Sequence, residues 1–203
     1  MSSSARIELV NARGTAGADD VRAVVLVEGL SDRSAVETLA ERRGRDLAAE
    51  GVSVVPIGGA QAIRRALDLY GPRGHDLVLA GLCDAGEEKS FLRGLERAGL
   101  GADLTRAAME HLGFYVCEVD LEDELLRALG ADVAEGVVEA HGDIGPFRTL
   151  QKQPEWRGRP LHDQLRRFFG SGGRRKIRYA RFLVEALDLD RVPRPLDGVL
   201  AHV

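Results

Sequence analysis

The chain has 203 residues, of which 44% are hydrophobic and 30% are charged, and its formal net charge is −4. This is the balance of an ordinary globular protein, long enough for one domain of moderate size or one domain with an appendage. No apolar run approaches the roughly 20 residues that a membrane-spanning helix needs, and the first residues lack the apolar core of a signal peptide. We therefore expect a cytoplasmic protein that does not contact membranes.

The charge is divided unevenly along the chain. Residues 142–203 carry 13 Lys and Arg against 7 Asp and Glu, so that 15 and 25 remain for residues 1–141. An acidic part joined to a basic part favours contact with nucleic acid, although solvated surface charge explains the same count.

The cysteines and histidines give no signature of a zinc site. Cys83 and Cys117 are the only two cysteines, and both fall in apolar, strand-like stretches. We interpret them as reduced core thiols, because two cysteines cannot build a zinc site alone and the five histidines show no ligand spacing.

The chain begins with a polar segment and continues with a short apolar run. Residues 1–20 are rich in Ser, Gly and Ala, which predicts a flexible leader, or an edge strand where residues 6–10 alternate between polar and apolar. The run Val24–Val27 is rich in β-branched residues and predicts a buried strand that leads to Glu28. A carboxylate at this place is a site candidate, because ligands of open α/β sheets bind outside the carboxyl ends of the strands.

The turn after this strand leads into a helix that carries a second acid. Gly29 permits a tight turn, and Ser31 is the predicted N-cap of the helix. With about 100° per residue, Asp32 lies on the apolar face of this helix, beside Glu28. An acid in a first turn often only complements the helix dipole, but the direction of Asp32 toward the sheet favours a role in a site.

Two further strands follow, and the second of them again ends in an acid. Residues 51–57 predict a buried strand that ends in the pair Gly58-Gly59, which we interpret as a structural turn before a helix at residues 60–70. The sequence contains no glycine-rich phosphate-binding motif. The next apolar run closes with Asp84. One such acid is commonly a helix cap, whereas the recurrence at two strand ends favours a shared site.

The fourth strand precedes a helix with an acid on its apolar face. Residues 113–117 predict the strand, and Asp120 is the expected N-cap of the helix. The leucines of this helix define a buried arc that includes Glu122, whereas Asp123 and Glu124 fall outside it and are interpreted as solvated surface charges. A buried lone carboxylate is costly, so Glu122 needs a partner, which a metal ion or a cationic side chain would supply.

Strands alternate with helices up to about residue 130, and the pattern is helical afterwards. This predicts an α/β domain at residues 21–131, with a mostly parallel sheet flanked by helices. A basic helical appendage is predicted for residues 132–203. Its helices are expected near residues 132–140, 146–152, 160–169 and 174–188, with a short helix at the end.

The basic stretch at residues 146–181 carries 11 Lys and Arg against two acids, with five aromatic residues among them. Such a composition suits a nucleic-acid surface, although each aromatic residue is more often part of a core. A Gly- and Ser-rich turn at residues 170–173 opens a helix with three cations in its first turn, which opposes the helix dipole unless an anion lies nearby. Lys176 lies on the apolar face of this helix and projects toward the protein, where it either faces a phosphate or extends to the surface.

Acids from four places in the chain are therefore expected at one edge of the sheet: Glu28, Asp32, Asp84 and Glu122. Carboxylates without His or Cys favour Mg²⁺ or Mn²⁺ as the metal. Such ions, held by carboxylates beside cationic side chains, serve phosphoryl-transfer chemistry, in which Lys or Arg neutralises the developing charge.

These motifs resemble a known family. A strand that ends in Glu-Gly, with a downstream strand that ends in Asp, is similar to the TOPRIM domain of topoisomerases, bacterial primases and some nucleases. Over residues 22–200, the order of the motifs more specifically resembles the nuclease part of the OLD (overcoming lysogenisation defect) family. The motifs are residues 27–32, the Gly58-Gly59 turn, residues 119–125 and the basic helix with Lys176.

The resemblance implies metal-dependent cleavage of DNA. In that family the four acids would match metal-binding residues, and Lys176 would match a lysine at the scissile phosphate. The sequence departs from the TOPRIM Asp-x-Asp pattern, since Gly86 stands in place of the second acid, and Glu87 or Glu88 could substitute for it. The family also typically carries an N-terminal ATPase, which we do not expect in this chain.

We therefore predict a stand-alone OLD-like TOPRIM endonuclease, a hydrolase that cleaves phosphodiester bonds by two-metal-type chemistry with Mg²⁺ or Mn²⁺. Glu28 and Lys176 are the predicted catalytic residues, and Glu87 joins the four acids as a metal ligand. The alternatives are a non-catalytic DNA-binding module and a nuclease subunit controlled by a separate ATPase. The partners to consider are DNA, a separate ATPase subunit and a second copy of the chain. The cations expected to contact DNA are Arg166, Arg167, Arg174, Arg175, Lys176 and Arg178.

Overall fold

A four-stranded parallel sheet with the strand order β2-β1-β3-β4 forms the centre of the molecule. The computed structural model describes residues 21–59 and 62–203, so the predicted leader or edge strand at residues 1–20 and the predicted start of the second helix lie outside the described residues. The strands are β1 (Ala23–Val27), β2 (Val52–Pro56), β3 (Val78–Asp84) and β4 (Phe114–Cys117). The predicted parallel α/β sheet is thereby confirmed.

Helices flank the sheet and then form a region of their own. Those that alternate with the strands are α2 (Leu30–Arg42), α3 (Ile63–Tyr70), α4 (Glu88–Ala98) and α5 (Arg106–His111), with a 3₁₀ turn η2 (Ala85–Glu87) before α4. After β4 follow α6 (Leu121–Leu129), α7 (Ala131–Ala140), α8 (Ile144–Lys152), α9 (Leu161–Phe169), α10 (Gly173–Ala186), the 3₁₀ turn η3 (Leu189–Arg191) and α11 (Arg194–Ala201). The C-terminal helical region was predicted close to these bounds.

The sheet separates two hydrophobic cores, because successive side chains of a strand point to opposite faces. Val25 and Val27 belong to the core that α2, α10 and α11 cover, whereas Val24 and Leu26 belong to the core beneath α3, α4 and α5. All four side chains are buried. β1 is therefore buried on both faces, which explains its uninterrupted apolar sequence.

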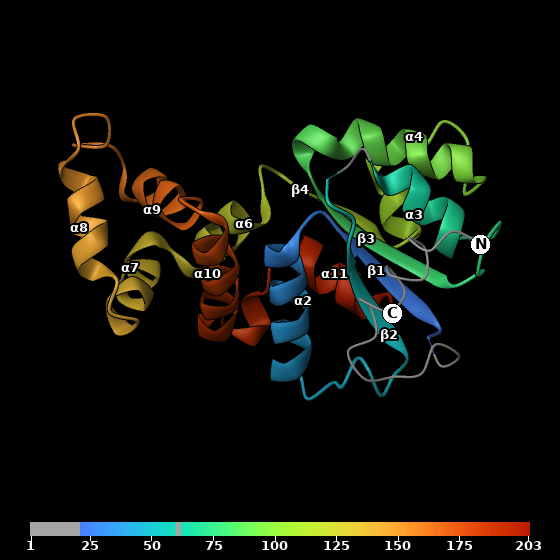
Figure 1. Ribbon diagram of the computed structural model, residues 1–203, viewed down its shortest axis with the longest axis horizontal. Coiled ribbons are helices and arrows are strands. Elements are labelled where there is room, and N and C mark those ends of the chain that lie inside the picture. Colours follow the sequence, from blue (N-terminus) through green and yellow to red (C-terminus); the bar gives the residue numbers. More distant parts are fainter. Residues whose placement is uncertain (1–20, 60–61) are drawn as a thin grey trace.

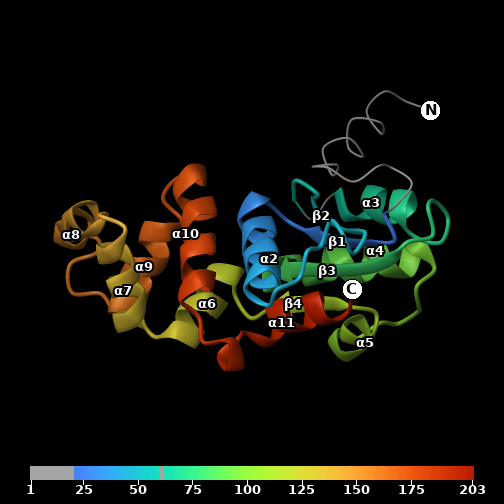
Figure 2. The same ribbon diagram turned by 90° about the horizontal axis from the view of Figure 1, so that it is seen from below.

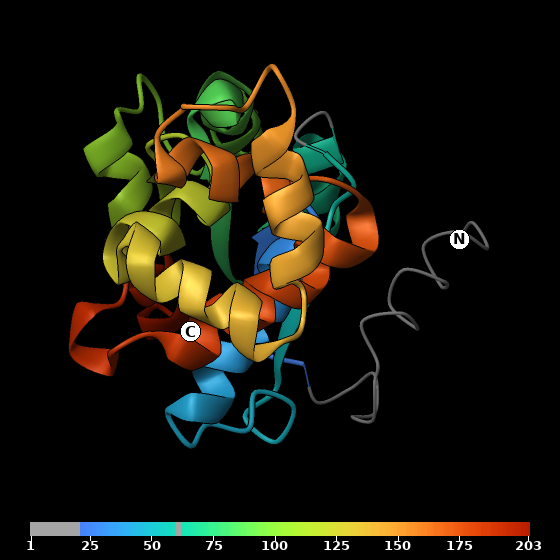
Figure 3. The same cartoon turned by 90° about the vertical axis from the view of Figure 1, so that its left-hand side faces the viewer.

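The helical region extends away from one side of the sheet and then returns to it. In Figure 1, α7, α8 and α9 lie farthest from the strands, and Figure 3 shows α7 and α8 from that end. α10 packs along α2, and α11 packs against β3 and β4, as Figure 2 shows from below. One continuous core joins the sheet to these helices. The predicted domain division after residue 131 stays a prediction, and this core crosses it.

Aromatic side chains fill the centre of the helical region. Phe147, Phe168, Phe169 and Tyr179 are each at most 1% exposed. The rings of Phe169 and Tyr179 stack with 4.6 Å between their centroids, and Phe168 meets Phe147 edge to face. These four residues are core residues, whereas Trp156 is only half-buried at the edge of the same core.

The two cysteines are buried and free, as predicted. Burial strongly raises the pKa of both thiols, so neither is a ready nucleophile. No helix within residues 21–59 and 62–203 combines the length and the apolar character that a membrane span requires.

Candidate functional site

Glu28 lies directly after β1 and connects three neighbouring strand ends. Its side-chain Oε1 accepts a hydrogen bond of 2.8 Å from the backbone N–H of Asp84, at the end of β3. Its backbone carbonyl accepts hydrogen bonds from Gly58 and Gly59, which follow β2, at 3.1 and 3.3 Å. Both glycines have a positive φ, 76° and 107°, which other residues rarely adopt. The glycine pair is therefore the turn that holds the backbone of Glu28.

Asp32 belongs to the first turn of α2 and is buried. Its Oδ2 accepts a 2.8 Å hydrogen bond from the backbone N–H of Gly29. Gly29 is the N-cap of this helix, and the prediction of Ser31 as N-cap was wrong. The helix begins earlier because Asp32, three residues after the cap, satisfies the free N–H that opens the helix.

The end of β3 carries Asp84, and two more acids follow: Glu87 ends the 3₁₀ turn η2, and Glu88 begins α4. Glu88 forms an ion pair of 2.5 Å with Arg106 of α5, and this contact holds its side chain toward α5 instead of toward Glu28. The negative charge of Glu87 acts on Glu28 and raises its pKa. Of the two acids proposed as substitutes for the missing second Asp, Glu87 is therefore the one whose charge reaches the candidate site.

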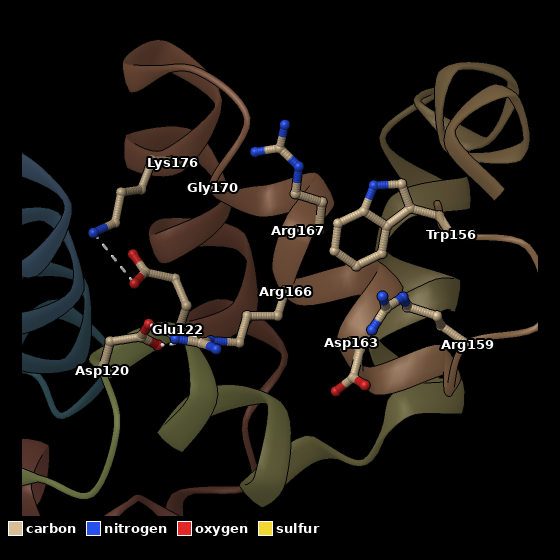
Figure 4. A pocket seen from close by; sticks show the side chains of 9 residues that line it. All are labelled: Asp120, Glu122, Trp156, Arg159, Asp163, Arg166, Arg167, Gly170 and Lys176. Carbon is tan, nitrogen blue, oxygen red and sulfur yellow. Dashed lines mark hydrogen bonds and ion pairs between the residues drawn. The ribbon is translucent and has the colours of Figure 1, made fainter. Parts of the chain in front are cut away.

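Glu122 and Lys176 form an ion pair that joins α6 to α10. The Lys176 Nζ lies 3.3 Å from Glu122 Oε2 (Figure 4), and Glu122 is only 4% exposed. The inward orientation of both side chains agrees with the prediction from helical phase, which placed each residue on the apolar face of its helix. The second oxygen of Glu122, Oε1, is buried without a hydrogen-bond partner.

The other acids of α6 were predicted only in part. Asp120 is the N-cap as expected, and its side chain accepts a 2.8 Å hydrogen bond from the N–H of Asp123. Asp123 and Glu124, predicted as solvated surface charges, are only 7% and 9% exposed. They are buried because α7, α9 and α10 all pack against α6, and each forms a 2.9 Å ion pair with Arg127 one turn later.

Burial raises the pKa of Glu28, Asp32, Asp84 and Glu122, four of the predicted metal-binding acids. The pKa of Asp84 rises to about 8, through burial first and then through the charges of Glu28 and Asp32. The pKa of Glu122 rises to about 7, mainly through burial, although Lys176 opposes the shift. Glu28 and Asp32 shift upward for the same main reason. The four acids are thus coupled through the charges of Asp32, Glu28 and Lys176, and burial disfavours the ionised form of each of them.

Lys176 is the cation of this group. Burial favours its neutral form, but the carboxylates of Glu122 and Asp32 outweigh burial and raise its pKa above the ordinary value. Its charge in turn favours the ionised forms of Glu28, Asp32, Asp84 and Glu122. Lys176 therefore stays protonated at the acidic edge of the sheet.

The side chains at this edge offer the type of ligand atom that a divalent cation prefers. These atoms are carboxylate oxygens, which Mg²⁺ and Mn²⁺ prefer, and the unpartnered Oε1 of Glu122 is a buried acceptor that a cation would satisfy. In the part of the chain that the structure describes, no three Asp, Glu, His or Cys side chains are arranged so that they could hold one ion. The predicted ligands are thus near one another without closing around a common centre.

The cations predicted to contact DNA have different surroundings. Arg166 pairs with Asp120, and Arg178 pairs with Asp143. Arg175 lies over the ring of Phe168, with 4.3 Å from its Cζ to the ring centroid. These three arginines also have structural roles.

Two of the predicted arginines are exposed and lack an acidic partner among the described residues. Arg167 and Arg174 form no ion pair with the residues that the structure describes. A contact of either with DNA stays a prediction.

Next to the Glu122–Lys176 pair lies a cavity of about 440 Å³ that the sequence did not indicate. Figure 4 shows that side chains from the loop between α8 and α9 contribute to it, including Trp156 and Arg159. Neither residue was predicted as part of a site. The available signal was that Trp156, the only tryptophan, stands in a polar, non-periodic segment rather than on an apolar helix face.

Comparisons with known proteins agree with this architecture. Residues 21–79 match the family model described as "Overcoming lysogenization defect protein-like, TOPRIM domain". The C-terminal region of the Xanthomonas campestris pv. campestris OLD protein is similar with a TM-score of 0.70 and 26% identity, over 90% of this chain and 92% of that chain. The C-terminal region of the Burkholderia pseudomallei OLD protein has a TM-score of 0.69 and 21% identity, over 90% and 96% of the two chains.

No curated protein matches the chain. The family model and the solved structures agree on the same relatives, and the structural match extends through the C-terminal helices. Residues 21–79 therefore resemble an OLD-like TOPRIM domain, and the chain shares the fold of the C-terminal region of OLD proteins.

Proposed function

We propose that this protein is a Mg²⁺- or Mn²⁺-dependent DNA endonuclease. The observation that carries the proposal is the gathering of four partly or fully buried carboxylates at the carboxyl ends of β1, β3 and β4, with Lys176 3.3 Å from Glu122. Acids whose pKa is raised by burial and by neighbouring charges are typical of functional sites. The likeness to the C-terminal regions of OLD proteins supports the same conclusion.

The acids would hold the divalent cation. Glu28, Asp32, Asp84 and Glu122 are the proposed ligands, and Glu87 would take the place of the missing second Asp. A bound ion would supply positive charge for the phosphate and make water a better nucleophile at neutral pH. It would also relieve the repulsion among the four carboxylates.

The chain's own residues would handle protons and charge during hydrolysis. Attack of a water oxygen on phosphorus releases a proton, and Glu28 is the proposed acceptor of that proton. The bond from phosphorus to one sugar oxygen breaks, and negative charge develops on that oxygen and on the phosphate. The protonated Lys176 would neutralise this charge, an effect worth about 100- to 1,000-fold in rate for a well-placed donor.

The start of α10 would contribute to phosphate binding. Its first turn contains Arg174, Arg175 and Lys176, and this concentration of positive charge is unfavourable beside the positive end of the helix dipole. An incoming phosphate would remove the conflict, because backbone N–H groups and cationic side chains at a helix N-terminus bind anions.

Nicking of supercoiled plasmid DNA in Mg²⁺ or Mn²⁺ tests the proposal. We expect the wild-type protein to nick the plasmid and Glu28→Gln to lose at least about 100-fold in rate. Glu185→Gln is a matched control, because Glu185 is an exposed acid that pairs with Arg181 near the end of α10. Equal nicking by wild type and Glu28→Gln would contradict the proposal.

Gly86 favours a second candidate, a DNA-binding module that no longer cleaves. This residue stands where the TOPRIM pattern has an acid, and its backbone is exposed. A mobility shift of DNA without cleavage in either metal would support this candidate. Cleavage that begins only when an OLD-type ATPase is added would instead support a subunit under the control of that partner.

A further inference from the structure

The cavity beside the candidate site has two chemically different ends. At one end are Glu122 and Lys176, the ion pair of the proposed nuclease site. At the other end the indole of Trp156 faces the cavity, with Arg167 beside it and Arg159 next to it (Figure 4). The volume of about 440 Å³ is in the range of pockets that hold one small-molecule-sized group.

The aromatic end carries two arginines and one acid, Asp163, so positive charge predominates there. The guanidinium Cζ of Arg159 lies 5.5 Å from the centroid of the Trp156 ring, and that of Arg167 lies 6.0 Å from it. Arg159 donates to the backbone carbonyl of Glu155. Neither arginine forms an ion pair within the described ranges, 21–59 and 62–203. An aromatic ring with two arginines nearby suits a ligand that has both a flat ring and a phosphate.

The position of Trp156 is fixed by buried hydrogen bonds. Its backbone carbonyl accepts a 2.7 Å hydrogen bond from Nε2 of Gln164, a residue of α9 that is only 6% exposed. Gln164 in turn accepts a 2.7 Å hydrogen bond from Gln151 of α8. The loop that carries Trp156 is therefore anchored to both flanking helices, while the ring itself stays half-exposed. This differs from the four buried aromatic residues of the same region, which only fill the core.

We propose that this cavity holds one unpaired base of the DNA strand, stacked on Trp156, while the adjoining phosphate lies toward Lys176. The inference rests on the proposed function and names its substrate class: DNA with unpaired nucleotides, such as single strands, flaps and frayed ends. In an intact duplex both faces of each base are covered by its neighbours, so a ring at the end of a cavity reaches only a base that has left the stack. Arg167 and Arg159 hold the phosphates that flank this base.

Trp156 reports on its own cavity, because it is the only tryptophan of the chain. Its fluorescence is measured in EDTA at low ionic strength, where no cleavage interferes, during titration with an oligothymidylate of about a dozen nucleotides. We expect strong quenching by the oligothymidylate and at least about 10-fold weaker binding of a blunt hairpin duplex. Equal quenching by the duplex, or no quenching by the single strand, would overturn the inference.

Thymidine monophosphate separates a strand site from a site for free nucleotides. We expect it to bind far more weakly than the oligonucleotide, because it lacks the flanking phosphates. Quenching at the same concentration as the oligonucleotide would mean that the cavity takes a free nucleotide, and would also overturn the inference.

Variants give a second measurement, the anisotropy of a labelled oligothymidylate. Trp156→Ala is expected to weaken binding about 5- to 100-fold, and Trp156→Phe, which keeps a ring to stack on, much less. Arg167→Gln is expected to weaken binding, whereas Arg181→Gln, an exposed arginine paired with Glu185, serves as the control. Because Arg167 is exposed, its variant tests the cavity even if Trp156→Ala perturbs the loop.

The two proposals fail in different ways. If single strands quench Trp156 but no DNA is cut, the cavity is assigned correctly and the nuclease proposal fails. If relaxed and supercoiled plasmids are nicked at the same rate, and Trp156→Ala keeps that rate, the nuclease proposal stands and the inference fails. The inference predicts that the supercoiled plasmid, which opens unpaired regions, is nicked and the relaxed plasmid is spared.

Discussion

The acidic and the basic halves of the candidate site are held in different ways. The acids at the sheet edge are fixed by the backbone: Glu28 accepts from the N–H of Asp84, and Asp32 accepts from the N–H of Gly29. The cations come from α9 and α10, and their position depends on how these helices pack on α2 and α6. Under the proposed function, the sheet would determine where the chemistry occurs, and helix packing would determine which DNA can approach it.

Removal of Lys176 should have the largest effect on activity, because its ion pair with Glu122 joins the acidic and the basic halves of the site. We expect Lys176→Ala to lower the nicking rate about 100- to 1,000-fold, because it removes the donor and leaves Glu122 buried without a cation. The rate is measured on supercoiled plasmid, with Arg181→Ala as a control from the same helix. A loss of less than about 5-fold would mean that Lys176 only balances the charge of Glu122.

A second substitution tests the contact that holds α10 against α2. Arg42 Nη1 donates to the carbonyls of Val184 and Leu187, at 2.8 and 2.7 Å, where α10 ends. Because Arg42→Ala leaves both carbonyls without this charged donor, we expect a loss of about 2 kcal/mol in the free energy of unfolding. Urea unfolding measures this loss, and Arg33→Ala is the control, because among the described residues the Arg33 side chain pairs with Glu37 of its own helix alone. Equal stability of the two variants would contradict the prediction.

The acids of the sheet edge should lower stability as the pH rises. The pKa of Asp84 is raised from 3.8 to about 8 in the folded protein, so the folded state holds its proton more tightly than the unfolded state does. The resulting contribution to the free energy of unfolding is complete below about pH 4 and is lost as the pH rises toward about 8. In EDTA we expect wild type to be less stable at about pH 8 than at about pH 6. Asp84→Asn should show a shallower decline and gain about 1 kcal/mol at the higher pH.

Urea unfolding at the two pH values measures both quantities. A variant that is less stable than wild type at the higher pH would show that Asp84 is stabilised by its surroundings rather than strained by them. Glu185→Asn is a suitable control, because this acid is exposed and distant from the sheet edge.

The smallest effect is expected when Gly86 is replaced by the Asp that the TOPRIM pattern has at this position. A Cβ at Gly86 would meet no atom within 4 Å, so Gly86→Asp should fold with a stability within about 0.5 kcal/mol of wild type. If Glu87 replaces the missing acid poorly, Gly86→Asp should raise the nicking rate a few-fold or lower the Mg²⁺ concentration required. Gly86→Asn controls for the size of the side chain. An unchanged metal requirement would indicate that Glu87 already serves as the ligand.

The sequence predicted best what depends on local periodicity. Glu28 and Asp84 follow apolar strands, and parallel strands place their carboxyl ends at one edge. Helical phase alone directed Lys176 and Glu122 inward, and the two residues meet at 3.3 Å.

Most of what the sequence did not predict depends on contacts between distant segments, and α5 is the exception. Asp123 and Glu124 are buried because three other helices cover α6, which its own sequence does not indicate. α5 is too short to show a clear apolar period, and it begins at a local signal, the Thr105 side chain that caps Ala108. The cavity at Trp156 combines a loop with α6, α9 and α10, so no single motif marks it.

The backbone of Glu28 has a practical consequence for finding the natural substrate. Its carbonyl holds Gly58 and Gly59 whatever side chain the residue carries, and the amide oxygen of a glutamine can still accept from the N–H of Asp84. Glu28→Gln should therefore lose cleavage while it keeps its architecture and its DNA-contacting surface. Such a protein would act as a trap, and sequencing of the DNA recovered with it from living cells would reveal which structures the active protein removes.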